Sequence, residues 1–188
     1  HSAVLTKSGR VYTWGDNSQG QLGINAPVSE RTGTPQLVTG MSKVIDLAEG
    51  AKGDTVRVVR YDGTMWAWGL NSNGQINSLS DRANYLSPVI VRLDTSTLER
   101  TLEDGTVETG MPDATQIVRV VDGKSHSLAL LTNGGVVEWG SNINNQLSGT
   151  DSSKKEEKNP LVYVPGYEGL TAQDASYAVT LSAGATHS

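Results

Sequence analysis

The sequence contains no cysteine, so the chain forms no disulfide bond and offers no thiolate to a metal ion. No apolar run approaches the roughly 20 residues of a membrane-spanning helix, and this segment is not expected to insert into a membrane. Positive charge is also scarce, with 15 Lys and Arg against 20 Asp and Glu and a net charge of −5. Because nucleic-acid binding depends on Lys and Arg contacts with phosphate, nucleic acid is not expected as the main partner.

Phenylalanine is absent as well, whereas glycine and small polar residues are abundant, which suits short strands joined by tight turns. One segment of this kind occurs three times. The copies read HSAVLTKSGRVYTWGDNSQGQLG at 1–23, TVRVVRYDGTMWAWGLNSNGQIN at 55–77 and HSLALLTNGGVVEWGSNINNQLS at 126–148. Three copies in one chain predict a repeat architecture.

Each copy contains a predicted β-hairpin. A glycine stands five residues before the Trp of a Trp-Gly pair, and strand-like runs rich in β-branched and aromatic residues flank it. The turn residues are Ser8-Gly9, Asp62-Gly63 and Asn133-Gly134. Asp-Gly and Asn-Gly favour a two-residue turn in which both central residues have positive φ, so we expect that turn type here.

The spacing continues beyond the Trp, with an Asn three residues on, a Gln seven on and a Leu or Ile eight on. We expect the Asn to shape a loop through backbone hydrogen bonds and the Leu or Ile to plug the core beneath it. A Pro then begins a third strand, at a position that sheets tolerate. These residues are Asn17, Asn71, Asn142, Gln21, Gln75, Gln146, Leu22, Ile76, Leu147, Pro35, Pro88 and Pro160.

A fourth strand is expected to close each unit, at 44–47, 118–121 and 178–181. Four strands per unit, three times over, predict an all-β chain whose four-stranded antiparallel sheets are blades of a β-propeller. The predicted boundaries within this one domain are about 1–53 for repeat 1, about 54–125 for repeat 2 and about 126–188 for repeat 3. Repeat 2 carries a hairpin insertion at 92–111.

The pattern of His-Ser, an apolar run, Asp/Asn-Gly, Trp-Gly and Asn-x-x-Gly-Gln-Leu-Gly resembles the regulator of chromosome condensation repeat. The first copy is nearly complete, with TWGDNSQGQLG as its most specific stretch. The resemblance covers essentially the whole chain and implies a propeller, usually of seven blades in this family. The later copies depart from the pattern in their loops, at Thr55, Asn77, Asn145 and Ser148.

Three blades cannot close a ring, and an open end would leave an apolar face in water. We therefore expect either a section of a larger propeller or one half of a six-bladed ring closed by two copies of the chain. The remaining blades or a second copy are accordingly expected partners.

The motifs that suggest chemistry have structural explanations. His1, His126 and His187 share one repeat position, which indicates a repeated hydrogen bond rather than a metal site. The Trp of each Trp-Gly pair is expected to pack between adjacent blades. The Gly-rich loops match no phosphate-binding fingerprint, and no Ser-His-acid constellation is defensible. We expect no catalytic residue, no cofactor and no metal.

The long insertion in repeat 2 is the largest departure from the pattern. Its strand-like segments at 97–102 and 106–109, joined by Glu103-Asp104-Gly105, predict an extra hairpin that projects from one face. In the nuclear exchange factor of the resembled family, a protruding hairpin contributes to binding a small GTPase. The candidate protein-binding residues are Glu99, Arg100, Leu102, Glu103, Asp104 and Val107. A decorative insertion is the alternative.

The sequence thus favours a non-catalytic propeller scaffold for protein recognition, as a fragment of a larger bacterial or extracellular repeat protein. One alternative is a guanine nucleotide exchange factor for a small GTPase, which only the resemblance supports. A second is a structural or adhesive module of a cell-surface protein, and a third is an enzyme built on a propeller. The cellular compartment stays open, with an extracellular or cell-surface setting favoured.

Overall fold

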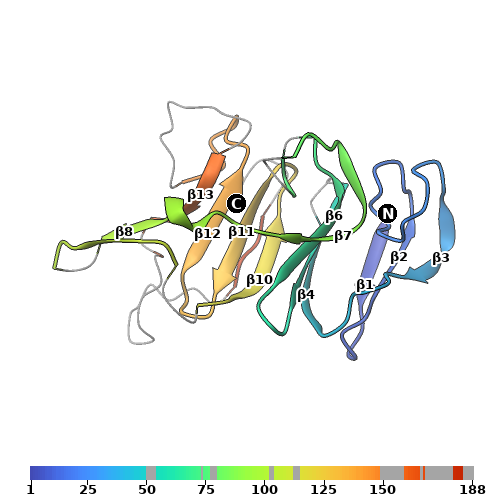
Figure 1. The fold of residues 1–188 in the computed structure, drawn as a ribbon, viewed down its shortest axis with the longest axis horizontal. Coiled ribbons are helices and arrows are strands. Elements are labelled where there is room, and N and C mark those ends of the chain that lie inside the picture. Colours follow the sequence, from blue (N-terminus) through green and yellow to red (C-terminus); the bar gives the residue numbers. More distant parts are fainter. Residues whose placement is uncertain are drawn as a thin grey trace.

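The computed structural model describes residues 1–49, 54–72, 74–76, 80–101, 104–111, 115–148, 159–165, 167 and 180–183. Its strands form three larger antiparallel sheets, which lie side by side along the molecule (Figure 1). Among the described residues, no helix has the length and apolar character that a membrane crossing requires.

The three sheets follow one another in chain order and are named sheet 1, sheet 2 and sheet 3. Sheet 1 contains β1 (Ser2–Leu5), β2 (Val11–Gly15) and β3 (Thr32–Leu37). Sheet 2 contains β4 (Val44–Glu49), β5 (Thr55–Arg60), β6 (Met65–Leu70) and β7 (Asn84–Val91). Sheet 3 contains β10 (Ile117–Asp122), β11 (His126–Leu131), β12 (Val136–Gly140) and β13 (Asn159–Tyr163).

The strand expected to close each repeat belongs instead to the next sheet. The 44–47 strand, as β4, pairs with β5, and the 118–121 strand, as β10, pairs with β11. Sheets 2 and 3 therefore each combine the last strand of one sequence repeat with the hairpin of the next, whereas sheet 1 has three strands among the described residues. Of the candidate at 178–181, residues 178 and 179 lie outside the described residues, and residues 180 and 181 are not part of a strand.

The hairpin turns differ from the expected type. Gly9, Gly63 and Gly134 have φ of 75°, 76° and 77°, but the residue before each glycine does not have positive φ. In the first turn the Gly9 amide donates to the Thr6 carbonyl (2.9 Å), and the Thr6 amide donates to the Arg10 carbonyl (2.9 Å). This is a three-residue loop whose last residue alone is left-handed.

The prolines also differ, since Pro35, Pro88 and Pro160 lie inside β3, β7 and β13 rather than at the first residue. The register of these strands shifts between Thr13 and Gly15, between Ala67 and Gly69 and between Glu138 and Gly140. The Trp of each Trp-Gly pair stands at this irregularity. A bulge on an outer edge strand tolerates Pro because a ladder hydrogen bond is already missing there.

The loop after each Trp has the predicted construction. The side-chain oxygens of Asn17, Asn71 and Asn142 accept backbone N–H bonds from Leu22 (3.0 Å), Ile76 (2.9 Å) and Leu147 (3.0 Å). The Leu or Ile at these positions is at most 4% exposed. The loop prediction is therefore confirmed in all three copies.

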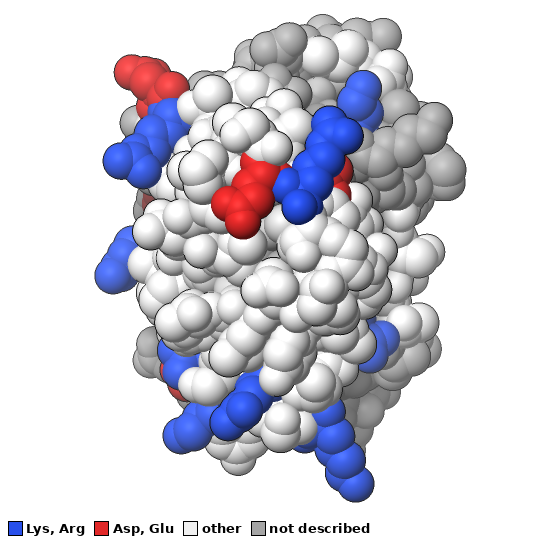
Figure 2. Space-filling model, turned by 90° about the vertical axis from the view of Figure 1, so that its right-hand side faces the viewer, with Lys and Arg blue, Asp and Glu red and all other residues white. Residues whose placement is uncertain are grey.

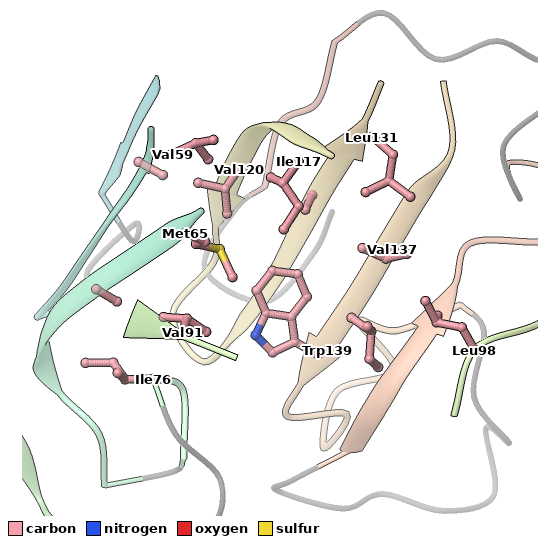
Figure 3. Close-up of a cluster of buried hydrophobic side chains, with 14 of the residues drawn as sticks. Val59, Met65, Ile76, Val91, Leu98, Ile117, Val120, Leu131, Val137 and Trp139 are labelled. Atoms are coloured by element: carbon pink, nitrogen blue, oxygen red, sulfur yellow. The ribbon is translucent and has the colours of Figure 1, made fainter. Parts of the chain in front are cut away.

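Sheet 2 is buried on both faces. Val56, Val58 and Trp68 lie in a cluster with residues of sheet 1, whereas the alternating residues Val59 and Met65 lie in a cluster with residues of sheet 3. Figure 3 shows the second cluster, with the Trp139 ring between the two sheets. The Trp68 indole N–H donates to the Gln21 carbonyl of sheet 1's loop (3.0 Å). The prediction that these Trp pack between blades is confirmed for Trp68 and Trp139.

The outward face of sheet 1 has no neighbouring sheet among the described residues. Val4, Tyr12 and Leu37 stand in one row across the three strands, and Val4 and Leu37 are 42% and 43% exposed. Figure 2 shows this end of the molecule, whose middle carries few charged side chains. The equivalent faces of sheets 2 and 3 are the ones that pack on a preceding sheet.

A buried ion pair joins sheets 2 and 3. Arg57 on β5, 1% exposed, donates to Asp122 on β10 and to the Ser127 hydroxyl (2.8 Å). It also donates to the Gln75 carbonyl (2.6 Å) and stands over the Trp139 ring. Burial raises the pKa of the Asp122 carboxyl, and the Arg57 guanidinium opposes that shift.

We predict that Arg57→Ala lowers the free energy of unfolding by about 3–5 kcal/mol, because Asp122 would be left as a buried charge without its counterion. Arg60→Ala, on the same strand but in a partly exposed pair with Asp62, should cost less than Arg57→Ala. Urea unfolding of both variants, of Asp122→Ala and of Arg57→Ala/Asp122→Ala checks this. The double variant should lose less free energy of unfolding than the sum of the losses of Arg57→Ala and Asp122→Ala. A loss equal to that sum would show that the two side chains are not coupled.

A second carboxylate joins the same two sheets, since the Val120 amide of β10 donates to Asp46 Oδ2 of β4 (2.8 Å). Burial raises the pKa of the Asp46 carboxyl, although the Val120 amide and Arg119 oppose the shift. A carboxyl whose pKa is raised by folding stabilises the folded state fully below its ordinary pKa of 3.8. This contribution is lost as pH rises through the pKa of the folded state.

Asn at position 46 keeps an acceptor but never ionises. We therefore predict that the stability of Asp46→Asn relative to the wild type increases as pH rises from below 3.8 to neutrality. Asp62→Asn is the control of opposite sign, because hydrogen bonds from Thr64 lower the pKa of the Asp62 carboxyl. Urea unfolding across this pH range measures both, and identical pH profiles of the two variants would contradict the prediction.

Candidate protein-binding site

The insertion of repeat 2 leaves the end of β7 through a short, well-bonded turn. The 3₁₀ helix η1 (Thr95–Thr97) begins after Asp94, whose Oδ1 accepts bonds from the Ser96 hydroxyl (2.5 Å) and amide (3.1 Å). These bonds, the hydroxyl's first, lower the pKa of the Asp94 carboxyl. The turn directs the chain toward sheet 3.

Two adjacent residues then fix the insertion to the body of the molecule. The Thr97 hydroxyl donates to the Leu161 carbonyl of β13 (2.8 Å), and the Leu98 side chain is fully buried in the cluster between sheets 2 and 3. The Gly110 amide donates to the Leu98 carbonyl (2.8 Å), so the outgoing and returning chains meet at this point. The base of the insertion is therefore part of the folded core.

Beyond this base the chain forms a two-stranded hairpin. β8 (Glu99–Thr101) pairs with β9 (Val107–Thr109), and the hairpin projects at the end of the molecule opposite sheet 1 (Figure 1). At its tip the Asp104 carboxylate accepts a bond from the Thr106 amide (2.9 Å), which lowers the pKa of that carboxyl. Gly105, with φ of 82°, supplies the left-handed residue of the turn.

The two faces of the hairpin have different character. On one face Arg100 donates two bonds to Glu108 Oε2, at 2.8 and 2.5 Å, and only 17% of the Arg100 side chain is exposed. The other face carries Glu99, Thr101, Val107 and Thr109, which are all exposed. Val107 is 56% exposed, an unusual position for a β-branched apolar side chain.

The structure thus separates the predicted site residues by role. Glu99 and Val107 lie on the exposed face, Arg100 is engaged within the hairpin, and Asp104 shapes the tip. Leu102 and Glu103 lie outside the described residues. Sequence reasoning missed the anchors Thr97 and Leu98, because Thr97 bonds a residue 64 positions away and Leu98 packs in a cluster formed by two sheets, which no local spacing signals.

No group of His, Asp or Glu suited to holding a metal occurs in the described part of the chain. His126 is buried at the start of β11, and His1 is half-buried before β1. His187 lies outside the described residues. The arrangement at the insertion therefore offers exposed polar and apolar contacts on a fixed support.

Stacked antiparallel sheets with one hairpin register and one Trp position define an open section of a β-propeller. Residues 8–53 match the model of the regulator of chromosome condensation (RCC1) repeat. The chain therefore contains an RCC1 repeat, and the predicted resemblance to this repeat and the predicted fold class are confirmed.

Relatives and solved structures agree with this fold. The chain is 30% identical over 190 residues to the human E3 ubiquitin-protein ligase HERC2, covering 100% of this chain and 3% of HERC2. It is 27% identical over 160 residues to the probable E3 ubiquitin-protein ligase HERC4 of Rattus norvegicus, covering 85% and 13%. Yeast RCC1 (Prp20), solved bound to Kap60, gives a TM-score of 0.61 at 22% identity, covering 97% and 37%.

The ligase activity in these names belongs to much longer proteins, of which the chain spans a small part, and it does not carry over. Human WBSCR16 gives a TM-score of 0.52 at 21% identity, with 97% of this chain and 53% of that chain covered. At such identities the likeness establishes the fold alone.

We predict that Leu98→Ala lowers the free energy of unfolding by about 2–5 kcal/mol, because it opens a cavity in the core cluster. It should also accelerate amide exchange in β8 and β9 more than in β5 and β6, since it removes the hairpin's apolar anchor. Leu37→Ala, at an exposed position, is the control and should change neither quantity appreciably. Unchanged exchange in the hairpin would contradict the anchoring role.

Proposed function

We propose that the chain is a non-catalytic propeller scaffold whose insertion hairpin recognises a partner protein. The observation that carries this proposal is the contrast between the hairpin's base and its outer face. Leu98 and Thr97 fix the base to sheet 3, whereas Glu99, Thr101, Val107 and Thr109 are exposed. A rigidly supported exposed strand pair loses little conformational entropy when a partner binds it.

Solved structures of the yeast relative support protein recognition as a use of this fold. One is of yeast RCC1 (Prp20) bound to Kap60, and another concerns the binding properties of that protein to Gsp1p and histones. Kap60, Gsp1p and histones are partners of the yeast protein and are not assigned to this chain. The extracellular or cell-surface setting expected from sequence finds no support in the relatives named above.

The hairpin's outer face offers a defined test. We predict that Val107→Lys weakens partner binding by about tenfold or more, because it puts a hydrated charge in place of the apolar side chain of the exposed face. Val28→Lys is the matched control, since Val28 is also an exposed valine, at 41%, but lies in repeat 1.

Affinity capture from the source cells identifies proteins held by the wild type and by Val28→Lys but lost with Val107→Lys. Calorimetry with the purified partner then measures the loss in affinity. If the two lysine variants retain the same set of proteins to the same extent, the hairpin is not the recognition site.

A further inference from the structure

An apolar pocket lies where the insertion leaves and rejoins the body of the molecule. Its volume is about 290 Å³, the lower end of the range for ligand sites. It is lined by Gly63, Thr64, Met65, Ile90, Val91, Arg92, Leu93, Thr95, Met111 and Ile117. Leu93 and Met111 belong to the two ends of the insertion, so the pocket adjoins the hairpin's base.

The floor of the pocket consists of core residues from both neighbouring sheets. Met65 and Val91 come from sheet 2 and Ile117 from sheet 3, and none is more than 9% exposed. Figure 3 shows these three side chains pointing into the space between the sheets. Ile90 at the rim is 38% exposed, and the two methionines are side chains that adapt to irregular guests. This construction suits one apolar side chain inserted from outside.

The junction of sheets 1 and 2 shows why the pocket exists. There a short link joins β3 to β4, and its residue Met41 is 5% exposed in the core cluster. The insertion replaces this link between β7 and β10. The same end of the second junction consequently stays open.

The positive charge of Arg92 at the rim indicates which charge the partner segment carries beside its apolar side chain. Arg92 is exposed, no ion pair of Arg92 occurs among the described residues, and the described lining of the pocket contains no carboxylate. A guanidinium beside an apolar pocket is complementary to a carboxylate next to an apolar group.

We propose that this pocket seats an apolar side chain of a partner segment that also presents a carboxylate to Arg92. The inference rests on the proposed function, because it assigns partner chemistry to the base of the same insertion. It treats the partner's anchor as separate from its contacts with the hairpin's outer face.

The chain's three methionines provide the test. Met65 and Met111 line the pocket, whereas Met41 lies in the cluster between sheets 1 and 2 and serves as an internal control. We predict that the peptide acetyl-Gly-Ser-Asp-Leu-Asp-Ser-Gly-amide, added to about 1 mM, shifts the ¹³C-methyl signals of Met65 and Met111 but not of Met41. Replacing its Leu with Ser, or both Asp with Asn, should reduce the shifts.

Variants of the protein sharpen the assignment. Arg92→Glu should weaken the peptide by about tenfold, and Ile90→Asp should do likewise by placing a carboxylate at the rim. Arg10→Glu and Ile45→Asp are matched controls at exposed positions away from the pocket, and they should leave the titration unchanged. Unshifted Met65 and Met111 signals, or equal affinity of the Asn-containing peptide, would overturn the proposal.

A shortened insertion separates this proposal from the function on which it rests. Because Leu98 and Gly110 are hydrogen-bonded, an Asn-Gly turn can replace residues 99–109 without disturbing the base. The peptide should still shift both methionines in this variant, and loss of the shifts would overturn the pocket assignment. If the peptide shifts neither methionine but capture of a partner still depends on the hairpin, the pocket assignment alone is refuted. Shifts without hairpin-dependent capture would refute the hairpin's role alone.

Discussion

Sheet 2 has no face that can meet water, and the rest of the structure depends on this constraint. Alternate residues of β5 point to opposite sides, yet Val56, Val58 and Val59 are all fully buried. Such a sheet is stable only between two others, so sheet 2 needs both sheet 1 and sheet 3 to bury its apolar faces. Arg57 belongs to the same strand, and its pairing with Asp122 penalises any displacement of sheet 3, because separation would leave two buried charges unpaired.

Stacking by faces determines where the repeats can vary. Both faces of sheet 2 are covered by neighbouring sheets, so variation there that preserves the core is confined to loops and to links between sheets. The insertion obeys this rule, since it enters after β7 and returns before β10. Its two ends meet at Leu98 and Gly110, which lets eleven residues be added beyond them without moving either sheet.

The sequence predicted the parts of the fold that local chemistry determines. The Asn that binds its own loop and the Leu or Ile beneath it act over five residues, and their repetition made them visible. The pairing of 44–47 with the next hairpin, the contact of Thr97 with Leu161 and the Arg57–Asp122 pair were not predictable. They depend on which strands become neighbours, and the last two join residues 64 and 65 positions apart.

The two junctions between sheets differ in a way that links stability to binding. At the first junction the Trp68 indole donates a hydrogen bond to the Gln21 carbonyl. At the second junction Arg57 donates to the equivalent carbonyl of Gln75 and also to Asp122. The second junction also carries the insertion and the open pocket. The buried pair joins the sheets at Asp122, the last residue of β10, whereas the pocket is lined by Ile117, the first residue of that strand. The pair therefore holds the two sheets together while the other end of the junction stays open.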